Sequence, residues 1–233
     1  MLFNFNELVK KHNMNMTGVI HIGAHECGEI KNYVEHKIKN GILVEANPQR
    51  AKNLEESVRI GRYPQECWPS VQYVTLSKEE AEICRNYKVF NFAVTDKVGE
   101  EIELNISTHD GGVDSIFKIN DVGVQTSWTN YQHIHSIKVP TTTLDELMKN
   151  VEEEYNFINL DVEGAELLVL KGGVETLKNK IQYIMLESQD VIRFDGSCSA
   201  RELEEFLVKL GFKLVDYADT GKGWGDQLYI KSI

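Results

Sequence analysis

Residues 17–29 read TGVIHIGAHECGE and carry the chain from one kind of secondary structure to another across a short loop. The first part, GVIHIG, is a short apolar run, which predicts a buried strand ending at Gly23. The apolar residues of the next segment recur at helical spacing and are Ile30, Tyr33, Val34 and Ile38. A buried strand joined to a helix by a glycine-containing loop is typical of the first unit of an α/β sheet.

The same alternation of apolar strands and amphipathic helices continues along the chain. Further strands are predicted at residues 41–47, 71–76, 88–94, 155–164 and 181–188. The last two strands, FKLVDYA and DQLYIKS, are separated by a short glycine-rich loop and predict an antiparallel hairpin at the sheet edge. These patterns predict a doubly wound α/β fold with a mostly parallel sheet.

Length and composition suit one domain spanning residues 1–233, in which residues 1–16 form an amphipathic lead-in helix rather than a signal peptide. No apolar run approaches the roughly 18–20 residues that span a bilayer, so no membrane span is expected. The four cysteines are scattered without a C-x-x-C pair, which favours free thiols and a cytoplasmic location. The net charge of −11, from 36 acidic and 25 basic residues, argues against a nucleic-acid partner.

The loop after the first strand excludes two common kinds of nucleotide site. It lacks the G-K-[ST] of a phosphate loop, and His25 stands where the second glycine of G-x-G-x-x-G would admit a pyrophosphate. Glu45 ends the second strand, 22 positions after Gly23, where a carboxylate can accept hydrogen bonds from both hydroxyls of a ribose. Together these features favour a nucleoside without phosphates, of which S-adenosylmethionine is the common example. A surface acid at a strand end is the alternative interpretation of Glu45.

Six segments resemble the FkbM-type family of S-adenosylmethionine-dependent methyltransferases and occur in that family's order. They are VIHIGAHECGE, ILVEANP, NFAVTD, TTTLDEL, FINLDVEGAELLVLKGG and YIMLES, which together cover roughly residues 17–190. The resemblance implies a class I methyltransferase, Rossmann-like fold with a seven-stranded sheet that ends in an antiparallel strand. It also implies O-methylation, often of a sugar or another small hydroxyl compound.

The resemblance also implies which residues contact the cofactor. The first loop would hold the methionine end, through Gly23, Ala24, His25 and Gly28. Glu45 would hold the ribose with Ala46 and Asn47 beside it, Ala93 would lie near the adenine, and Asp161 would also contact the cofactor. The family loop often reads D-x-G-A-N, whereas this chain has His21 in place of the acid and His25 in place of the asparagine.

Two acids are the candidates for the chemistry. Asp161 and Glu187 follow or end buried strands that should be neighbours in the sheet, so their carboxylates should face the ligand. Methyl transfer to oxygen needs an aligned hydroxyl and a group that takes its proton. Asp161 is the first candidate for this general base and Glu187 the second. The alternative for Asp161 is that it caps the helix starting near Gly164.

Residues 107–137 form an irregular stretch rich in aromatic, hydroxyl and imidazole groups, which suits an acceptor-binding insertion. The candidate acceptor-binding residues are His109, Ser115, Trp128 and Glu163, of which Ser115 matches a serine that the family tends to keep. A plain surface loop is the alternative. The pair His133 and His135, or His109, could also supply a base, and no metal site is expected because no third fixed ligand accompanies that pair.

The leading hypothesis is therefore an S-adenosylmethionine-dependent O-methyltransferase that acts on a small-molecule or glycan-like acceptor. An NAD-dependent oxidoreductase on the same fold would need a tighter glycine motif and a hydride-site group such as Tyr-x-x-x-Lys, and neither is present. Methylation of an RNA-cap 2′-hydroxyl would need lysines after the strands that carry Asp161 and Glu187. A cofactor-binding module without catalysis is the non-enzyme alternative.

Overall fold

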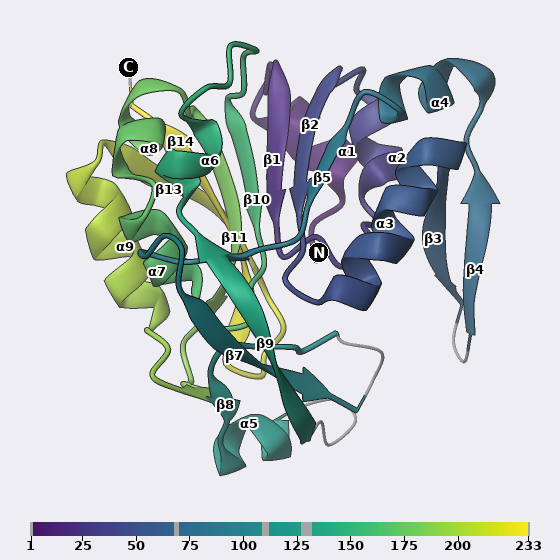
Figure 1. Cartoon of the computed structure of the whole chain (residues 1–233). Coiled ribbons are helices and arrows are strands. Elements are labelled where there is room, and N and C mark those ends of the chain that lie inside the picture. Colours follow the sequence, from purple (N-terminus) through teal and green to yellow (C-terminus); the bar gives the residue numbers. More distant parts are fainter. Residues whose placement is uncertain (1, 68–69, 109–111, 127–131, 233) are drawn as a thin grey trace.

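The computed structural model describes residues 2–67, 70–108, 112–126 and 132–232 (Figure 1). Its main feature is a seven-stranded sheet with the order β13-β14-β11-β10-β1-β2-β5. The strands are β1 (Gly18–Ile22), β2 (Asn40–Val44), β5 (Lys88–Phe90), β10 (Phe157–Leu160), β11 (Tyr183–Gln189), β13 (Phe212–Asp219) and β14 (Trp224–Lys231). The first five run parallel, and β14 is antiparallel to both β11 and β13. This confirms the predicted sheet and its antiparallel edge hairpin.

Helices cover both faces of the sheet because alternate strand residues point to opposite sides and both sets are apolar. One face packs against α1 (Phe5–Lys11), α2 (Ile30–Glu35), α3 (Pro48–Ile60) and α4 (Lys78–Cys84). The other face packs against α6 (Leu144–Met148), α7 (Glu166–Lys171), α8 (Val174–Asn179) and α9 (Ala200–Lys209). Figure 1 shows the two groups of helices on opposite sides of the sheet. In β1, for example, Val19 belongs to the first core and Ile20 to the second.

The strand predicted at 88–94 is wrong as a single element, because the chain leaves the sheet after Phe90. The side-chain amide of Asn91 donates to the carbonyls of Glu45 and Ala46, which turns the chain away from β2. The remainder, β6 (Ala93–Val94), pairs instead with β9 (His133–Thr142), which also pairs with β7 (Glu101–Ser107). These three strands form an arm with its own small core, which includes Ala93, Leu104 and Val139.

Four further elements were not predicted. β3 (Arg62–Cys67) pairs with β4 (Ser70–Thr75), so the strand predicted at 71–76 belongs to a separate hairpin rather than to the main sheet. Within the irregular stretch 107–137, the structure contains β8 (Lys118–Ile119) and α5 (Asp121–Thr126), and β8 pairs with β12 (Phe194–Asp195). Among the described residues, no helix has the length and apolar character needed to cross a membrane.

Candidate active site

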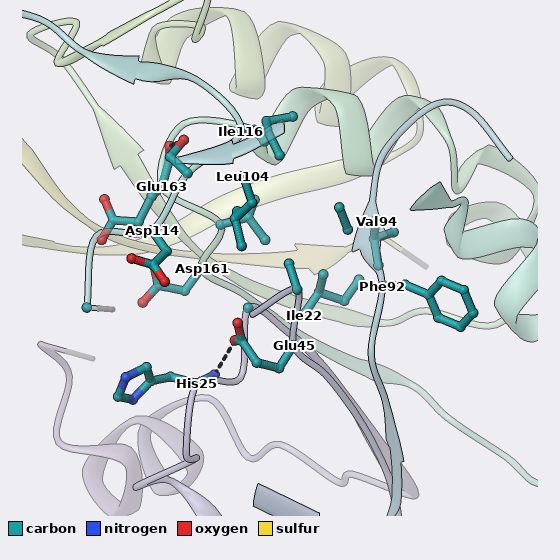
Figure 2. Close-up of a pocket in the computed structure, with 17 residues that line it drawn as sticks. Ile22, His25, Glu45, Phe92, Val94, Leu104, Asp114, Ile116, Asp161 and Glu163 are labelled. Atoms are coloured by element: carbon teal, nitrogen blue, oxygen red, sulfur yellow. Dashed lines mark hydrogen bonds between the residues drawn. The ribbon is translucent and has the colours of Figure 1, made fainter. Parts of the chain in front are cut away.

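A pocket that is partly open to solvent lies where β1, β2 and β10 end beneath the arm. It contains eight of the residues singled out from the sequence: Gly23, His25, Glu45, Ala46, Ala93, Ser115, Asp161 and Glu163. Figure 2 shows Asp114, Asp161 and Glu163 on one side of the pocket and Phe92 and Val94 on the other. The pocket therefore combines an apolar wall with a carboxylate wall.

The loop after β1 is held tightly against both neighbouring strands. Gly23 has a left-handed φ of 79°, and the amides of Gly23 and Ala24 both donate to the carbonyl of Val44, at 2.9 and 3.0 Å. On its other side, a Cβ at position 23 would lie 1.6 Å from the backbone carbonyl oxygen of Asp161. Only glycine allows the three chain segments to approach this closely.

Glu45 is a buried carboxylate whose two oxygens are both fixed by backbone amides. Oε2 accepts from the His25 amide (Figure 2) and Oε1 from the Asn47 amide, each at 2.7 Å. Burial raises the pKa of Glu45, and these two hydrogen bonds oppose that rise. Each carboxylate oxygen can accept more than one hydrogen bond, so Glu45 can also receive ligand hydroxyls.

Asn47 connects the site to the arm. Its Oδ1 accepts from the amides of Gln49 and Arg50 and so caps α3, as its place before Pro48 predicts. Its Nδ2 donates to Asp114 Oδ2 at 2.7 Å, and Asp114 Oδ1 accepts from the Ser107 amide at 2.7 Å. Asp114, which the sequence analysis missed, is therefore fixed between the N-terminus of α3 and β7.

Three carboxylates meet at the ends of β10 and β11, and we call Asp161, Glu163 and Glu187 the acid trio. One oxygen of each lies within 4.8 Å of the others. Burial is the main cause that raises the pKa of all three, to about 8 for Glu163, where the charge of Asp161 adds to the effect. The protein alone therefore holds protons in this cluster near neutral pH.

Arg193 supplies the positive charge beside the acid trio. Its Nη2 lies 2.5 Å from Glu187 Oε1 and 3.7 Å from Glu163 Oε2, and the side chain is only 7% exposed. The guanidinium also lies 5.0 Å from the centroid of the Trp224 ring. Arg193 was missed because it lies in an irregular segment. The signal that could have found it is the requirement that clustered buried acids need a cation.

Ser115 shapes the loop that carries Glu163. The Ser115 hydroxyl donates to the carbonyl of Glu163 at 2.7 Å and accepts from the Phe117 amide at 3.0 Å. Glu163 itself has a left-handed φ of 51°, which is uncommon for a residue with a side chain. Ser115 is almost fully buried, and its hydroxyl is occupied by these two bonds. Ser115 therefore tethers the arm to the loop that carries Glu163 of the acid trio.

The capping alternative for Asp161 is wrong, because α7 begins at Glu166 and its N-cap residue is Ala165, which has no side-chain cap hydrogen bond. Instead, Glu166 Oε1 accepts from the amides of Val162 and Gly164, at 3.3 and 3.1 Å. Glu166 is 3% exposed, and burial raises its pKa to about 7. This acid organises the loop between Asp161 and α7.

The raised pKa of Glu166 makes a prediction about stability and pH. A carboxyl with pKa 4.5 when unfolded and about 7 when folded stabilises the folded state fully below pH 4.5, and this contribution is lost as the pH rises through 7. As the pH rises from 4.5 to 7, the free energy of unfolding should therefore fall by about 3 kcal/mol less in Glu166→Gln than in the wild type. Urea unfolding across this range measures the difference.

Glu202 offers a matched control in the first turn of α9. It is fully exposed, and hydrogen bonds from the Ser199 amide and hydroxyl lower its pKa. Between pH 4.5 and 7, Glu202→Gln should therefore lose at least as much stability as the wild type. If Glu166→Gln and the wild type follow parallel curves, burial of this carboxyl does not govern the pH dependence.

His21 does not take the place of an acid facing the pocket but belongs to a buried polar network. Its Nδ1 lies 3.1 Å from the Tyr33 hydroxyl and 3.4 Å from Cys27 Sγ, while Asn159 Nδ2 lies 3.3 Å from its Nε2. Burial lowers the pKa of His21 to about 4, so the ring is neutral at pH 7. The network joins β1, β10 and α2 beneath the first loop.

The remaining candidates lie at or beyond the edge of the pocket. Ala24 is buried and Gly28 lies in the turn before α2, and neither lines the pocket, nor does Asn47. Glu187 faces a second, smaller pocket, which Asp161 also lines. His109 and Trp128 lie outside the described residues. The apolar wall of the pocket was not predicted from the sequence; it is formed in part by Ile22, Phe92, Val94, Leu104 and Val162.

The sheet order and the pocket at the carboxyl ends of its strands define the class I methyltransferase fold. A family model described as methyltransferase FkbM domain matches residues 21–214, and the chain belongs to this family. This confirms the resemblance found in the sequence.

Solved structures share the fold at low sequence identity. The FkbM methyltransferase from Methylobacillus flagellatus KT matches with a TM-score of 0.55 and 12% identity, over 92% of this chain and 43% of that one. A SAM-dependent methyltransferase from Aquifex aeolicus matches with a TM-score of 0.50 and 11% identity, over 99% of this chain and 91% of that one. The chain thus spans less than half of the Methylobacillus protein. No curated protein matches the sequence significantly.

Proposed function

We propose that the protein is an S-adenosylmethionine-dependent O-methyltransferase that methylates a hydroxyl of a sugar or glycan-like acceptor. The observation that carries the proposal is that one pocket contains both Glu45, held with its carboxylate at the end of β2, and two members of the acid trio. Glu45 suits binding of a ribose, and the carboxylates of the acid trio suit proton transfer.

The residues of the pocket fit the parts of this cofactor. Glu45 would accept from the ribose hydroxyls, Ala93 and the apolar wall would contact the adenine, and the loop at Gly23 and His25 would hold the methionine end beside Asp161. When bound, S-adenosylmethionine supplies a methyl group on a positively charged sulfur. The negative charge of the neighbouring carboxylates matches that positive charge.

The chain's own residues then have three tasks. The cofactor loop and the arm orient the two ligands, and the arm limits access of water from one side of the pocket. A carboxylate of the acid trio takes the proton of the acceptor hydroxyl; Asp161 and Glu187 are the candidates from the sequence. None of the described residues that line the pocket is Lys or Arg, which supports a neutral acceptor over a phosphorylated one or a nucleic acid.

Calorimetry with S-adenosylmethionine, S-adenosylhomocysteine and NAD tests the cofactor. We expect both sulfur nucleosides to bind and NAD not to bind. Binding of NAD alone would exclude the proposal in favour of an oxidoreductase. Methyl transfer to a panel of neutral sugars, lipids and small phenols then tests the acceptor, with transfer to a sugar hydroxyl as the expected result.

Glu45→Gln should weaken binding of both sulfur nucleosides by about 10- to 100-fold. The amide offers one acceptor oxygen instead of two, and its NH₂ group would face either the His25 amide or the Asn47 amide, which are both donors. The loss of a hydrogen bond to a charged group costs about 1.5–3 kcal/mol. Titration calorimetry measures the change, and Glu55→Gln, an exposed carboxylate on α3, is the control. Unchanged affinity in Glu45→Gln would remove Glu45 from the cofactor site.

A further inference from the structure

The acid trio and Arg193 do not have matching charges. Three carboxylates share one guanidinium, and the contact with Glu187 at 2.5 Å is much shorter than the 3.7 Å contact with Glu163. Glu187 is buried and lines the smaller pocket rather than the main one. Arg193 therefore forms its closer ion pair with Glu187. The other two carboxylates, Asp161 and Glu163, line the main pocket.

The two remaining carboxylates lie on different sides of the site. The backbone carbonyl of Asp161 packs against Gly23, so Asp161 belongs beside the cofactor loop, and its side chain lines both pockets. Glu163 lies two residues further on and is tethered to the arm through its carbonyl and the Ser115 hydroxyl. Its Oε2 is enclosed and has no hydrogen-bond partner among the described residues, although Arg193 Nη2 lies 3.7 Å away as an ion-pair partner. The Glu163 carboxylate therefore lies in the main pocket and can still accept a hydrogen bond.

We infer that Glu163 is the general base, an inference that rests on the function proposed above. Arg193 is a positioning residue, because its ion pair with Glu187 keeps Glu187 from acting as the base. In the transfer step, the acceptor oxygen forms a bond to the methyl carbon, and the bond from that carbon to sulfur breaks with its electron pair remaining on sulfur. The proton of the acceptor hydroxyl passes to the carboxylate of Glu163 and later leaves to solvent.

The surroundings of Glu163 also control when it can act as a base. The charged and titratable groups that face it are Asp114, Asp161, Glu166, Glu187 and Arg193. With four acids and one cation around it, Glu163 has a pKa of about 8 and is mostly protonated at pH 7. A positive charge placed in the pocket stabilises the carboxylate and lowers this pKa. Cofactor binding should therefore release the proton of Glu163 and prepare it to accept another from the acceptor.

Proton release during cofactor binding provides the first test and does not depend on turnover. Calorimetry at pH 7.5 in two buffers with different ionisation enthalpies counts the protons released by S-adenosylmethionine, which carries the positive sulfur, and by S-adenosylhomocysteine, which does not. We expect the charged ligand to release up to roughly 0.7 proton more, since a group of pKa 8 is about three-quarters protonated at this pH. Equal release by the two ligands overturns the inference even without a variant.

Variants assign the released proton to one residue. Glu163→Gln should abolish the difference between the two ligands, whereas Asp161→Asn should keep it and move it to lower pH, because the neighbouring negative charge is gone. If Asp161→Asn abolishes the difference and Glu163→Gln keeps it, Asp161 is the base. If the wild type binds neither sulfur nucleoside, the proposed function fails instead, so the two failures are distinguishable.

Kinetics provide the second test. Glu163→Gln should lower kcat by about 10²- to 10⁴-fold while cofactor affinity changes by less than about fivefold. Arg193→Gln should move the acid limb of the kcat profile to higher pH, because Glu163 loses a nearby positive charge, and Arg193→Lys should move it back. A pH profile that is the same in Arg193→Gln and the wild type would show that Arg193 has no influence on the base.

Discussion

Gly23→Ala should lower the free energy of unfolding by about 4 kcal/mol. The added Cβ would lie 1.6 Å from the carbonyl oxygen of Asp161, so β1 and β10 must separate at their carboxyl ends. Such an overlap costs about 1–3 kcal/mol, and a left-handed φ of 79° adds about 1–2 kcal/mol for any residue with a Cβ. Urea unfolding measures the loss, and any protein that remains folded should bind S-adenosylmethionine more weakly because the same displacement moves the cofactor loop.

Gly99→Ala separates the two costs. Gly99 has a φ of 74°, yet a Cβ there meets nothing within 4 Å. We expect a loss of only about 1–2 kcal/mol, which represents the backbone conformation alone. Equal losses in the two variants would mean that the contact between Gly23 and Asp161 does not limit this site.

Arg193→Met should lower the free energy of unfolding by about 3–5 kcal/mol at pH 8, because it leaves the buried Glu187 carboxylate without its partner. The pKa of Glu187 is already raised by burial, and removal of the guanidinium raises it further. In the variant, Glu187 should therefore become neutral by proton uptake as the pH falls. The loss should be clearly smaller at pH 5.5 than at pH 8, as measured by urea unfolding at both values.

The double variant Arg193→Met/Glu187→Gln tests the cause of that loss. With no charge at position 187, it should recover most of the stability at pH 8 and show little difference between pH 8 and pH 5.5. If the double variant is as unstable as Arg193→Met, the loss comes from packing of the long side chain against Trp224 rather than from the unpaired charge.

The main sheet was predictable because its strands are buried on both faces and their apolar runs stand out in the sequence. The arm and the hairpin β3–β4 were less predictable. β3 carries a proline at position 64 and mostly polar side chains, so it lacks the apolar alternation that reveals a strand. The division of residues 88–94 depends on hydrogen bonds from Asn91 to a strand that is distant in sequence, and no local pattern encodes such contacts.

The site shows the same limit. Gly23, Glu45 and Asp161 could be found because each follows a strand end at a recognisable spacing, and the structure brings them into one pocket. Asp114 and Arg193 come from irregular segments, and only the fold places them beside Asn47 and Glu187. Their positions depend on long-range contacts, as does the tether between Ser115 and Glu163.

The position of β14 has a consequence for synthesis of the protein. β14 follows β13 in the sequence, yet it lies between β13 and β11 in the sheet. While residues 224–231 are still in the ribosome, β11 has an open edge and β13 has no strand to pair with. The nascent chain must therefore carry the apolar strand β11 with one unpaired edge until residues 224–231 have emerged, and such an edge is open to pairing with other chains.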